Sequence, residues 1–185
     1  MQVLSTDIAD VKILIPDKFG DPRGYLSETW SVRGLEAAGI GCGFVQENHT
    51  LSNAAGTIRG LHYQIPPSAQ DKLVRVLRGR MLDVAVDIRR DSPTFGRHVC
   101  VELSPENRKQ LFVPVGFAHG FATQEANTEV LYKMSGYYST EHERGILWSD
   151  PALGIEWGIS EAEAVVNVRD AGFPRLSEAV DLFGC

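Results

Sequence analysis

The stretch from residue 73 to residue 88 most constrains how this chain can fold. In its second half, apolar side chains take every other position from Leu82 to Ile88. Side chains of a β-strand point alternately to its two faces, so the pattern predicts a half-buried strand rather than a helix. The preceding Arg78-Gly79-Arg80 predicts a tight hairpin turn before that strand.

Shorter segments with strand character recur along the chain, separated by turns that contain glycine and proline. We expect strands over residues 11–15, 44–49, 99–103, 110–113 and 128–134. Many short strands at regular spacing are typical of an all-β sandwich or barrel. Two short helices are expected, one capped by Ser31 and ended by Gly39, and one over residues 175–183. No repeat or linker interrupts the sequence, so we expect a single domain over residues 1–185.

Composition excludes several classes of function. A formal net charge of −6 argues against a general nucleic-acid-binding surface, although a local cationic pocket for an anionic small molecule remains open. No apolar run is long enough to cross a bilayer, and the first residues lack the pattern of a signal peptide. Cys42, Cys100 and Cys185 form neither a zinc pattern nor a disulfide framework, so a reducing cytoplasm is the expected compartment.

The stretch from Arg59 to Lys72 carries residue types that suit proton transfer from carbon. A histidine such as His62 can act as a base at physiological pH, and a nearby arginine and lysine can hold the negative charge that the transfer creates. Strict alternation would put Arg59 and His62 on opposite faces of a strand, but a bulge at Gly60 would bring both to one pocket. The alternative is a structural histidine bonded within a core or a turn.

Two residues far from this stretch could assist His62. Tyr132 shares a strand face with Val130 and Met134, so it points inward, either as a core aromatic or as a general acid. Asp170 is either a turn residue or a carboxylate that holds the imidazole of His62, as in a catalytic triad.

Other residues could bind a ligand. Residues 113–121 are expected to join two strands, and their glycines allow close approach of a ligand to the backbone. There His119 is either a turn histidine or a partner for a phosphate or carbonyl group. One ring of Tyr137-Tyr138 could stack on a flat base. Three arginines could bind a phosphate group by charge-assisted hydrogen bonds: Arg23, Arg59 and Arg169.

A metal centre and a bound redox cofactor are the rival chemistries. No two of the five histidines have the spacing that aims two rings from one strand face at one ion. The sequence also lacks a nucleophile motif, a glycine-rich phosphate loop and a dinucleotide fingerprint. We therefore expect no metal and no organic cofactor.

Several motifs, each weak alone, together identify a family. They are Phe19-Gly20-Asp21-Pro22-Arg23-Gly24, Val45-Gln46-Glu47-Asn48-His49, Arg59-Gly60-Leu61-His62-Tyr63-Gln64, Lys72-Leu73-Val74-Arg75, Asp83-Val84-Ala85-Val86-Asp87-Ile88-Arg89, Ser92-Pro93-Thr94-Phe95-Gly96, Val113-Pro114-Val115-Gly116-Phe117-Ala118-His119-Gly120-Phe121, Tyr132, Tyr137-Tyr138 and Ile146-Leu147-Trp148-Ser149-Asp150-Pro151. With these motifs, the chain resembles the dTDP-4-dehydrorhamnose 3,5-epimerase family over most of its length.

The resemblance implies a fold, an assembly and a set of catalytic roles. The fold would be a cupin-like double-stranded β-helix, or jelly roll, that forms a homodimer through its N-terminal strands and works without metal or organic cofactor. His62 matches the proton acceptor of the family and Tyr132 the proton donor. Lys72 matches the lysine near the C4 oxygen of the substrate, and Asp170 the carboxylate paired with the histidine.

The same resemblance implies the substrate contacts. The ring of Tyr138 would stack on thymine. The remaining contacts match Arg23, Glu28, Gln46, Glu47, Asn48, Arg59, His119, Glu143 and Arg169. Glu47 stands where aspartate is expected and Arg169 where lysine is common, which keeps each charge but changes its reach.

The implied reaction belongs to dTDP-rhamnose biosynthesis. The ketone of dTDP-4-dehydro-6-deoxy-D-glucose acidifies the hydrogens at C3 and C5, and inversion of both centres gives dTDP-4-dehydro-L-rhamnose. Three alternatives stay open. They are an epimerase of only one of these carbons for an antibiotic sugar, a ketoisomerase, and a non-catalytic barrel that binds sugar nucleotides.

Overall fold

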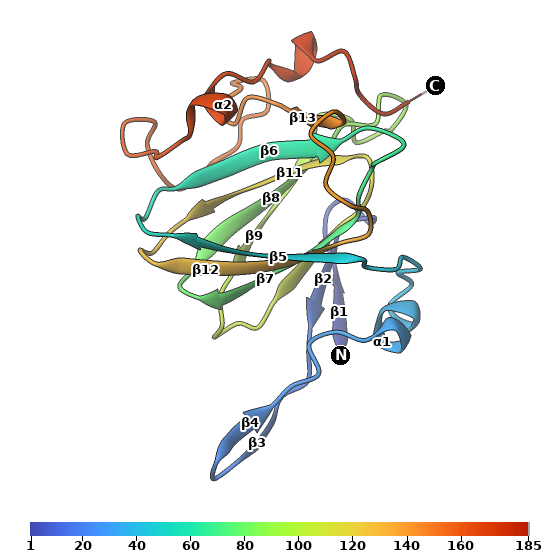
Figure 1. Cartoon of the computed structure of the whole chain (residues 1–185), viewed down its shortest axis with the longest axis vertical. Helices are drawn as coiled ribbons and strands as arrows, with labels where there is room; N and C mark the ends of the chain where they lie inside the picture. The colour runs from blue at the N-terminus through green and yellow to red at the C-terminus, as the bar shows by residue number, and fades with distance from the viewer. Residues whose placement is uncertain (185) are drawn as a thin grey trace.

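β-Strands dominate the computed structural model, which describes residues 1–184 (Figure 1). Cys185 lies outside the described residues. One antiparallel sheet has the order β1 (Gln2–Ser5), β2 (Lys12–Ile15), β10 (Gln110–Val113), β7 (Lys72–Arg78), β12 (Thr128–Met134) and β5 (Gln46–Ser52). The other has the order β13 (Glu143–Gly145), β6 (Ile58–Gln64), β11 (Phe117–Thr123), β8 (Met81–Asp87) and β9 (His98–Leu103).

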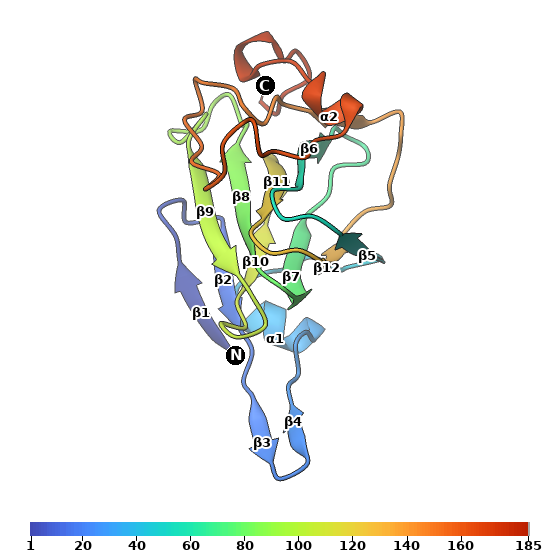
Figure 2. The same cartoon turned by 90° about the vertical axis from the view of Figure 1, so that its left-hand side faces the viewer.

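The two sheets pack face to face, with the main core between them (Figure 2). Val74 and Val130 enter this core from the six-stranded sheet, and Ala85 and Phe121 enter it from the five-stranded sheet. This arrangement confirms the expected cupin-like jelly roll. No helix in the described part of the chain is long and apolar enough to cross a membrane.

The predicted strand at the centre of the sequence is present as β8, but it is not half-buried. Its inner face carries Asp83 and Asp87 beside core residues, and its other face, with Val84 and Val86, packs in a second apolar cluster. That cluster includes Trp157 and other residues from the C-terminal third of the chain. Both faces of the strand are therefore covered, because the C-terminal segments pack over the outside of the five-stranded sheet.

The predicted hairpin turn at residues 78–80 is wrong. The turn is tight, with a positive φ of 77° at Gly79, but β7 pairs with β10 and β12 whereas β8 pairs with β9 and β11. The chain therefore passes from one sheet to the other here. Two strands with the same alternation pack equally well in one sheet or in two facing sheets, so the pattern alone did not distinguish the two connections.

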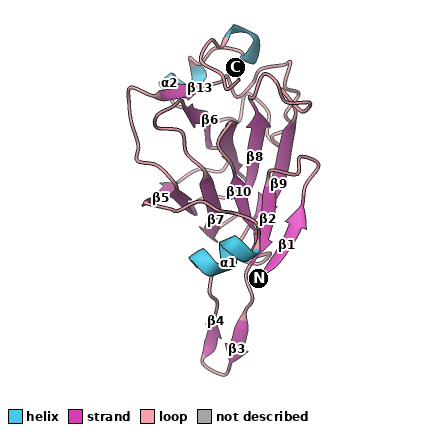
Figure 3. Ribbon diagram, turned by 90° about the vertical axis from the view of Figure 1, so that its right-hand side faces the viewer, coloured by secondary structure: helices cyan, strands magenta, loops and turns pink. Residues whose placement is uncertain are grey.

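The helical predictions are partly confirmed. Ser31 caps α1 (Val32–Ala37) by accepting a hydrogen bond from the Gly34 N–H at 3.2 Å, and α1 lies against the six-stranded sheet (Figure 3). The expected helix over residues 175–183 is only a 3₁₀ turn, η1 (Leu176–Glu178). Beyond that turn, the backbone of Phe183 accepts a hydrogen bond from the Arg90 N–H, and this tertiary contact holds the end of the segment extended.

Two further elements differ from expectation. Residues 117–123 form strand β11, whereas the glycines of residues 113–121 had suggested a connection. The short helix α2 (Val168–Ala171) was not predicted. A separate hairpin of β3 (Phe19–Asp21) and β4 (Gly24–Leu26) projects away from the two sheets, at the bottom of Figure 1.

The predicted irregularity at Gly60 is confirmed. His62 lies opposite His119 and Arg59 lies opposite Phe121, so β6 has one more residue than β11 over this interval. Gly60 has a φ of 130°, and a Cβ on it would lie 2.5 Å from the Cα of Gly120. Only glycine fits both this backbone conformation and this close approach.

We expect Gly60→Ala to lower the free energy of unfolding by at least about 1–3 kcal/mol, since it adds backbone strain to a backbone clash. Urea denaturation measures the loss. Gly41→Ala is the matched control because a Cβ there meets no atom of residues 1–184 within 4 Å and the backbone φ is not positive. Equal stability of the two variants would contradict the packing described here.

Candidate active site

A cavity of about 390 Å³ lies between the two sheets. Eleven of the sequence-predicted site residues line it: Gln46, Asn48, Arg59, His62, Lys72, His119, Tyr132, Tyr138, Glu143, Arg169 and Asp170. Sequence reasoning missed other lining residues, among them Thr50, Gln64, Gln70 and Asn167. These are ordinary polar residues within strands or loops, and no motif singled them out.

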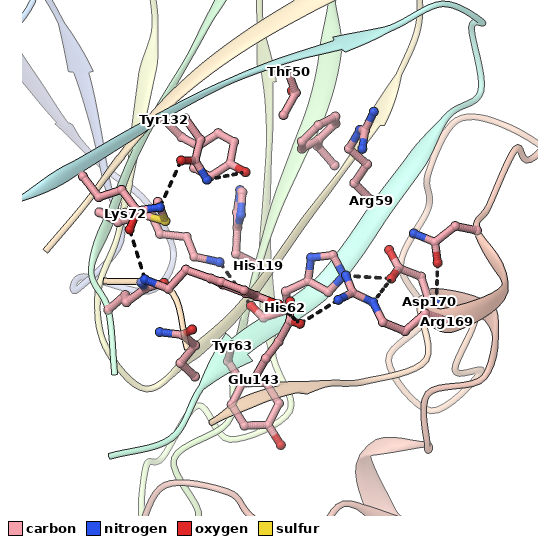
Figure 4. Close-up of a pocket in the computed structure, with 18 residues that line it drawn as sticks. Thr50, Arg59, His62, Tyr63, Lys72, His119, Tyr132, Glu143, Arg169 and Asp170 are labelled. Atoms are coloured by element: carbon pink, nitrogen blue, oxygen red, sulfur yellow. Dashed lines mark hydrogen bonds and ion pairs between the residues drawn. The ribbon is translucent and has the colours of Figure 1, made fainter. Parts of the chain in front are cut away.

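His62 is held from two sides, by Asp170 (Figure 4) and by Phe173. Its Nε2 lies 3.0 Å from Oδ1 of the fully buried Asp170, and its ring packs edge-on against Phe173, with 5.7 Å between ring centroids. Asp170 is in turn fixed by the Gly60 N–H, which donates to Oδ2 at 3.0 Å. The bulge in β6 therefore positions both the histidine and the carboxylate that orients it.

The electrostatics of this pair favour a charged carboxylate. Burial raises the pKa of Asp170, but the hydrogen bond and charge of His62, the Gly60 N–H and the charge of Arg169 outweigh it, so the net pKa lies below its usual value. An ionised Asp170 accepts the Nε2 proton of His62, which leaves Nδ1 as the other ring nitrogen.

Tyr132 and His62 enter the cavity from opposite walls, because β12 belongs to the six-stranded sheet and β6 to the five-stranded sheet (Figure 4). The hydroxyl oxygen of Tyr132 accepts a hydrogen bond from Nδ2 of Asn48 at 3.2 Å. Asn48 is its cross-strand neighbour on β5. Because the tyrosine oxygen is the acceptor here, its own proton stays available for a ligand.

Lys72 supplies a cation near these two residues. Its Nζ donates to the backbone carbonyl of His62 at 3.3 Å. Burial lowers the pKa of Lys72 to about 8, although the charges of Asp83 and Glu143 act in the opposite direction. The lysine therefore carries a charge at neutral pH that is partly removed from water, where it acts strongly on a nearby anion.

His119 is a buried strand residue, not a turn residue. Its Nε2 lies 2.7 Å from Oδ1 of Asp83, which is fully buried on the neighbouring strand β8. Burial lowers the pKa of His119, Asp83 raises it, and Lys72 and His62 lower it, with a net downward shift. Sequence reasoning missed Asp83. Its signal in the sequence was its place at the start of a family motif, residues 83–89.

Cations and an aromatic ring surround the cavity mouth. Oε2 of Glu143 accepts hydrogen bonds from the Tyr138 hydroxyl at 2.8 Å and from Nη1 of Arg169 at 2.6 Å. The Tyr138 N–H donates to Oε1 of Gln46 at 3.0 Å. Arg59 approaches from β6 and donates to the backbone carbonyl of Leu51. The mouth can therefore hold an anion beside a flat ring.

Three predicted contacts lie outside the cavity of their own chain. Arg23 is exposed on the projecting hairpin and pairs with Asp21. Glu28 accepts a hydrogen bond from the Ser31 hydroxyl at 2.8 Å, near the start of α1. Glu47 points away from the cavity and pairs with Lys133, because alternation along β5 puts it on the opposite face from Gln46 and Asn48.

The side chains of the cavity are arranged for proton transfer rather than for metal binding. Among residues 1–184, no group of three or more histidine, cysteine, aspartate or glutamate side chains could hold a metal ion. A histidine and a tyrosine on opposite walls, with an ammonium group between the same walls, can move a proton off one face of a ligand and onto the other.

Comparison with known proteins gives one consistent answer. The family model described as dTDP-4-dehydrorhamnose 3,5-epimerase matches residues 5–178. The enzyme of that name from Sinorhizobium fredii is 49% identical over 178 residues, which cover 96% of this chain and 91% of the relative.

Solved structures agree with the sequence relatives. The 3,5-epimerase from Legionella pneumophila, in complex with dTDP-4-keto-L-rhamnose, has a TM-score of 0.94 and 41% identity, and the match covers 100% of this chain and 98% of that one. A 3'-monoepimerase from Streptomyces bikiniensis, in complex with dTDP-quinovose, is more distant, with a TM-score of 0.86, 30% identity and coverage of 94% and 87%.

The pKa of Lys72 is directly testable. In protein with ¹³C-labelled lysine, one ¹³Cε resonance should titrate with a midpoint near pH 8, because burial favours the neutral amine. The charge is present below that midpoint and lost above it. Lys72→Met should remove that resonance and so assign it. A spectrum in which the signal lost in Lys72→Met titrates near 10.5 would refute the burial argument.

Proposed function

The chain belongs to the dTDP-4-dehydrorhamnose 3,5-epimerase family, and from this premise we propose a role for each side chain in its cavity. The enzyme inverts C3 and C5 of dTDP-4-dehydro-6-deoxy-D-glucose. We propose that His62 is the base and Tyr132 the acid. The observation that supports this assignment is their entry from opposite walls of one cavity, with Lys72 beside them.

In the proposed chemistry, each inverted carbon loses one proton and gains another. His62 takes the hydrogen from a carbon next to the C4 ketone, and the electron pair of the C–H bond moves to the C4 oxygen as an enolate. Lys72 stabilises that oxygen by its charge. Tyr132 then delivers its own proton to the opposite face of the carbon. The protonated His62 and the phenolate of Tyr132 are reset by exchange with solvent, and the sugar shifts before the second inversion.

Asp170 and the residues at the mouth have supporting roles. Asp170 holds the ring of His62 and stabilises its protonated form, which fits their 3.0 Å contact. Arg59 and Arg169 bind the diphosphate, with an arginine at residue 169 in place of the more common lysine. Gln46, Asn48, His119 and Glu143 line the remaining substrate surface, and Tyr138 stacks on thymine.

We further propose that the enzyme is a homodimer. The projecting hairpin exposes Phe19, Tyr25 and Leu26 at 65%, 67% and 68%, an unusual apolar surface for a free element. Arg23 lies on this hairpin and Glu28 just beyond it, both outside their own cavity. Contact of the hairpin with a second copy would cover the apolar side chains and bring both charged residues to the partner's cavity. Glu47 would then serve a contact in the assembly rather than in its own cavity.

The proposal includes three broader features. The histidine, tyrosine and lysine supply all the acid–base chemistry, so the reaction needs no metal or organic cofactor. A cytoplasmic location fits the free Cys42 and Cys100 and the nucleotide-sugar substrate. Residues 1–185 form one domain in this proposal, which the family match over residues 5–178 supports.

Solvent exchange tests the function. In heavy water, the enzyme should place deuterium at both C3 and C5 of dTDP-4-dehydro-6-deoxy-D-glucose, read position by position by NMR. Label at one carbon alone would indicate a single-centre epimerase, such as the Streptomyces relative. Absence of exchange at both carbons, with dTDP still bound, would leave a non-catalytic binding protein or an enzyme for another sugar.

The same assay separates base from acid. His62→Asn should slow exchange by about 10²–10⁴-fold, because the base is lost, while dTDP binding persists. Tyr132→Phe should keep exchange but lose inversion, because His62 can still remove a proton and return a solvent-derived one to the same face. Loss of exchange together with loss of dTDP binding in His62→Asn would mark His62 as a binding or folding residue.

Mixed dimers test whether the cavity is shared. Arg23→Ala and His62→Asn should each be inactive alone, but co-expressed chains should recover about a quarter of wild-type activity. Half of the dimers are then mixed, and each mixed dimer has one cavity with both residues intact. Co-expression of His62→Asn with Lys72→Met is the control and should recover nothing, since both changes lie in the cavity of their own chain. Equal recovery in both mixtures, or none in either, would contradict the shared cavity.

A further inference from the structure

Asp83 is a buried carboxylate that lies behind the wall of the cavity. Its side chain makes fewer hydrogen bonds than a buried structural carboxylate would. It lies on the inner face of β8, fully buried, with Met81 and Ala85 of the main core on the same face. Oδ1 contacts Nε2 of His119 at 2.7 Å, whereas Oδ2 has no hydrogen-bond partner among the described residues. A carboxylate left half unsatisfied in a core is costly, so its presence needs an explanation.

Asp87 shows what a structural carboxylate looks like on the same strand. It is also fully buried and lies on the same face of β8. Its two oxygens accept hydrogen bonds from Arg89, Ser92 and Thr94, so it ties the end of the strand to the following loop. These contacts account for the burial of Asp87. Within residues 1–184, Asp83 bonds to no cation or hydroxyl of a loop, and its one hydrogen-bond partner is His119, a residue of the cavity.

Asp83 is close enough to the cationic side of the cavity to act on two groups. Its charge raises the pKa of His119 and that of Lys72, against the effect of burial on each. The other anion that acts on Lys72 is Glu143, which is already paired with Arg169 and Tyr138. Of these two anions, Asp83 has the larger effect on Lys72 and is the main counter-charge for it.

The full set of charged and titratable groups explains why such an anion is needed. These groups line the cavity from every side: Arg59, His62 and Tyr63 on β6, Lys72 on β7, His119 on β11, Tyr132 on β12, Tyr138 in the loop after β12, Glu143 on β13, and Arg169 and Asp170 on α2. When His62 takes a proton, a new positive charge appears beside Lys72. Repulsion between the two favours loss of the lysine proton when the enolate most needs it.

We propose that Asp83 is a positioning residue for the epimerisation, which holds His119 through Nε2 and keeps Lys72 cationic during turnover. The inference rests on the proposed roles of His62 and Lys72. A carboxylate only accepts hydrogen bonds, so Nε2 of His119 carries the proton. In the neutral ring, Nδ1 is then the acceptor, and it is offered to a hydroxyl group of the bound sugar.

Asp83→Asn tests the role of the charge, with Asp87→Asn as the matched control on the same strand and face. In a plot of log kcat against pH, the fall at alkaline pH (the alkaline limb) should occur about one pH unit lower in Asp83→Asn than in the wild type. The reason is that the remaining charges hold the Lys72 proton less well. The Kd for dTDP should stay unchanged, since dTDP lacks the sugar. Asp87→Asn should lower stability in urea without moving the limb.

The outcomes separate the inference from the proposed function. If wild-type enzyme exchanges deuterium at C3 and C5 but Asp83→Asn keeps the wild-type pH profile, the role of Asp83 is overturned while the function stands. If wild-type enzyme exchanges at neither carbon, the function itself fails. Asp83→Glu keeps the charge and should keep the alkaline limb near its wild-type position even where kcat falls.

A measurement that leaves Asp83 unchanged decides the orientation of His119 if the Asp83 variants do not fold. In protein with ¹⁵N-labelled histidine, one ring should show a protonated Nε2 and an unprotonated Nδ1 across pH 6–8, and His119→Gln should remove its signals. A His119 ring with the proton on Nδ1, or on both nitrogens throughout this range, would overturn the proposed orientation.

Discussion

The close approach of β6 to β11 at Gly60 and Gly120 is the constraint on which the site depends. The extra residue in β6 turns Arg59 and His62 to the same cavity, and it directs the Gly60 N–H to Asp170. One backbone irregularity therefore aligns the histidine, its carboxylate and a cation for the substrate. A regular ladder would send one of the two side chains to the opposite face. The site is thus built into the pairing of two strands of the rigid scaffold rather than into a mobile loop.

The electrostatics of the cavity depend on carboxylates that different elements place beside its basic side chains. Buried cations are unfavourable unless anions compensate them. Asp170 faces His62 from α2, Glu143 faces Arg169 from β13, and Asp83 faces His119 from β8. A chain with a formal net charge of −6 can therefore hold cationic groups in its cavity, because carboxylates from other elements lie beside Arg169 and the two histidines. An incoming diphosphate or enolate adds negative charge where the protein has already placed positive charge, so little reorganisation is needed.

The sequence predicted the strands better than it predicted their partners. Alternation locates β8 and β12, and turn residues locate their ends, because both signals are local. The passage of the chain between sheets at Gly79 is not local, since it depends on which strands lie beside β7 and β8. The residues of the cavity were found where a motif or a resemblance marked them, as for His62 and Lys72. Asp83 begins one of the motifs, but no role was assigned to it, because its pattern is that of an ordinary strand. Only the burial of both strand faces shows that its charge lies inside the protein.

The C-terminal segments explain why a strand with charged residues on its inner face is stable. Val84 and Val86 turn outward, where Ile146 and Trp157 cover them, so β8 buries apolar surface on the side away from the cavity. This second cluster stabilises the five-stranded sheet independently of the core between the sheets. The inner face can therefore carry Asp83 and Asp87. Without the second cluster, the main core alone would have to offset the cost of burying these two carboxylates. The same covering segments continue into α2 and deliver Asp170 to His62. Packing on the outer face and chemistry on the inner face are therefore two consequences of one chain path.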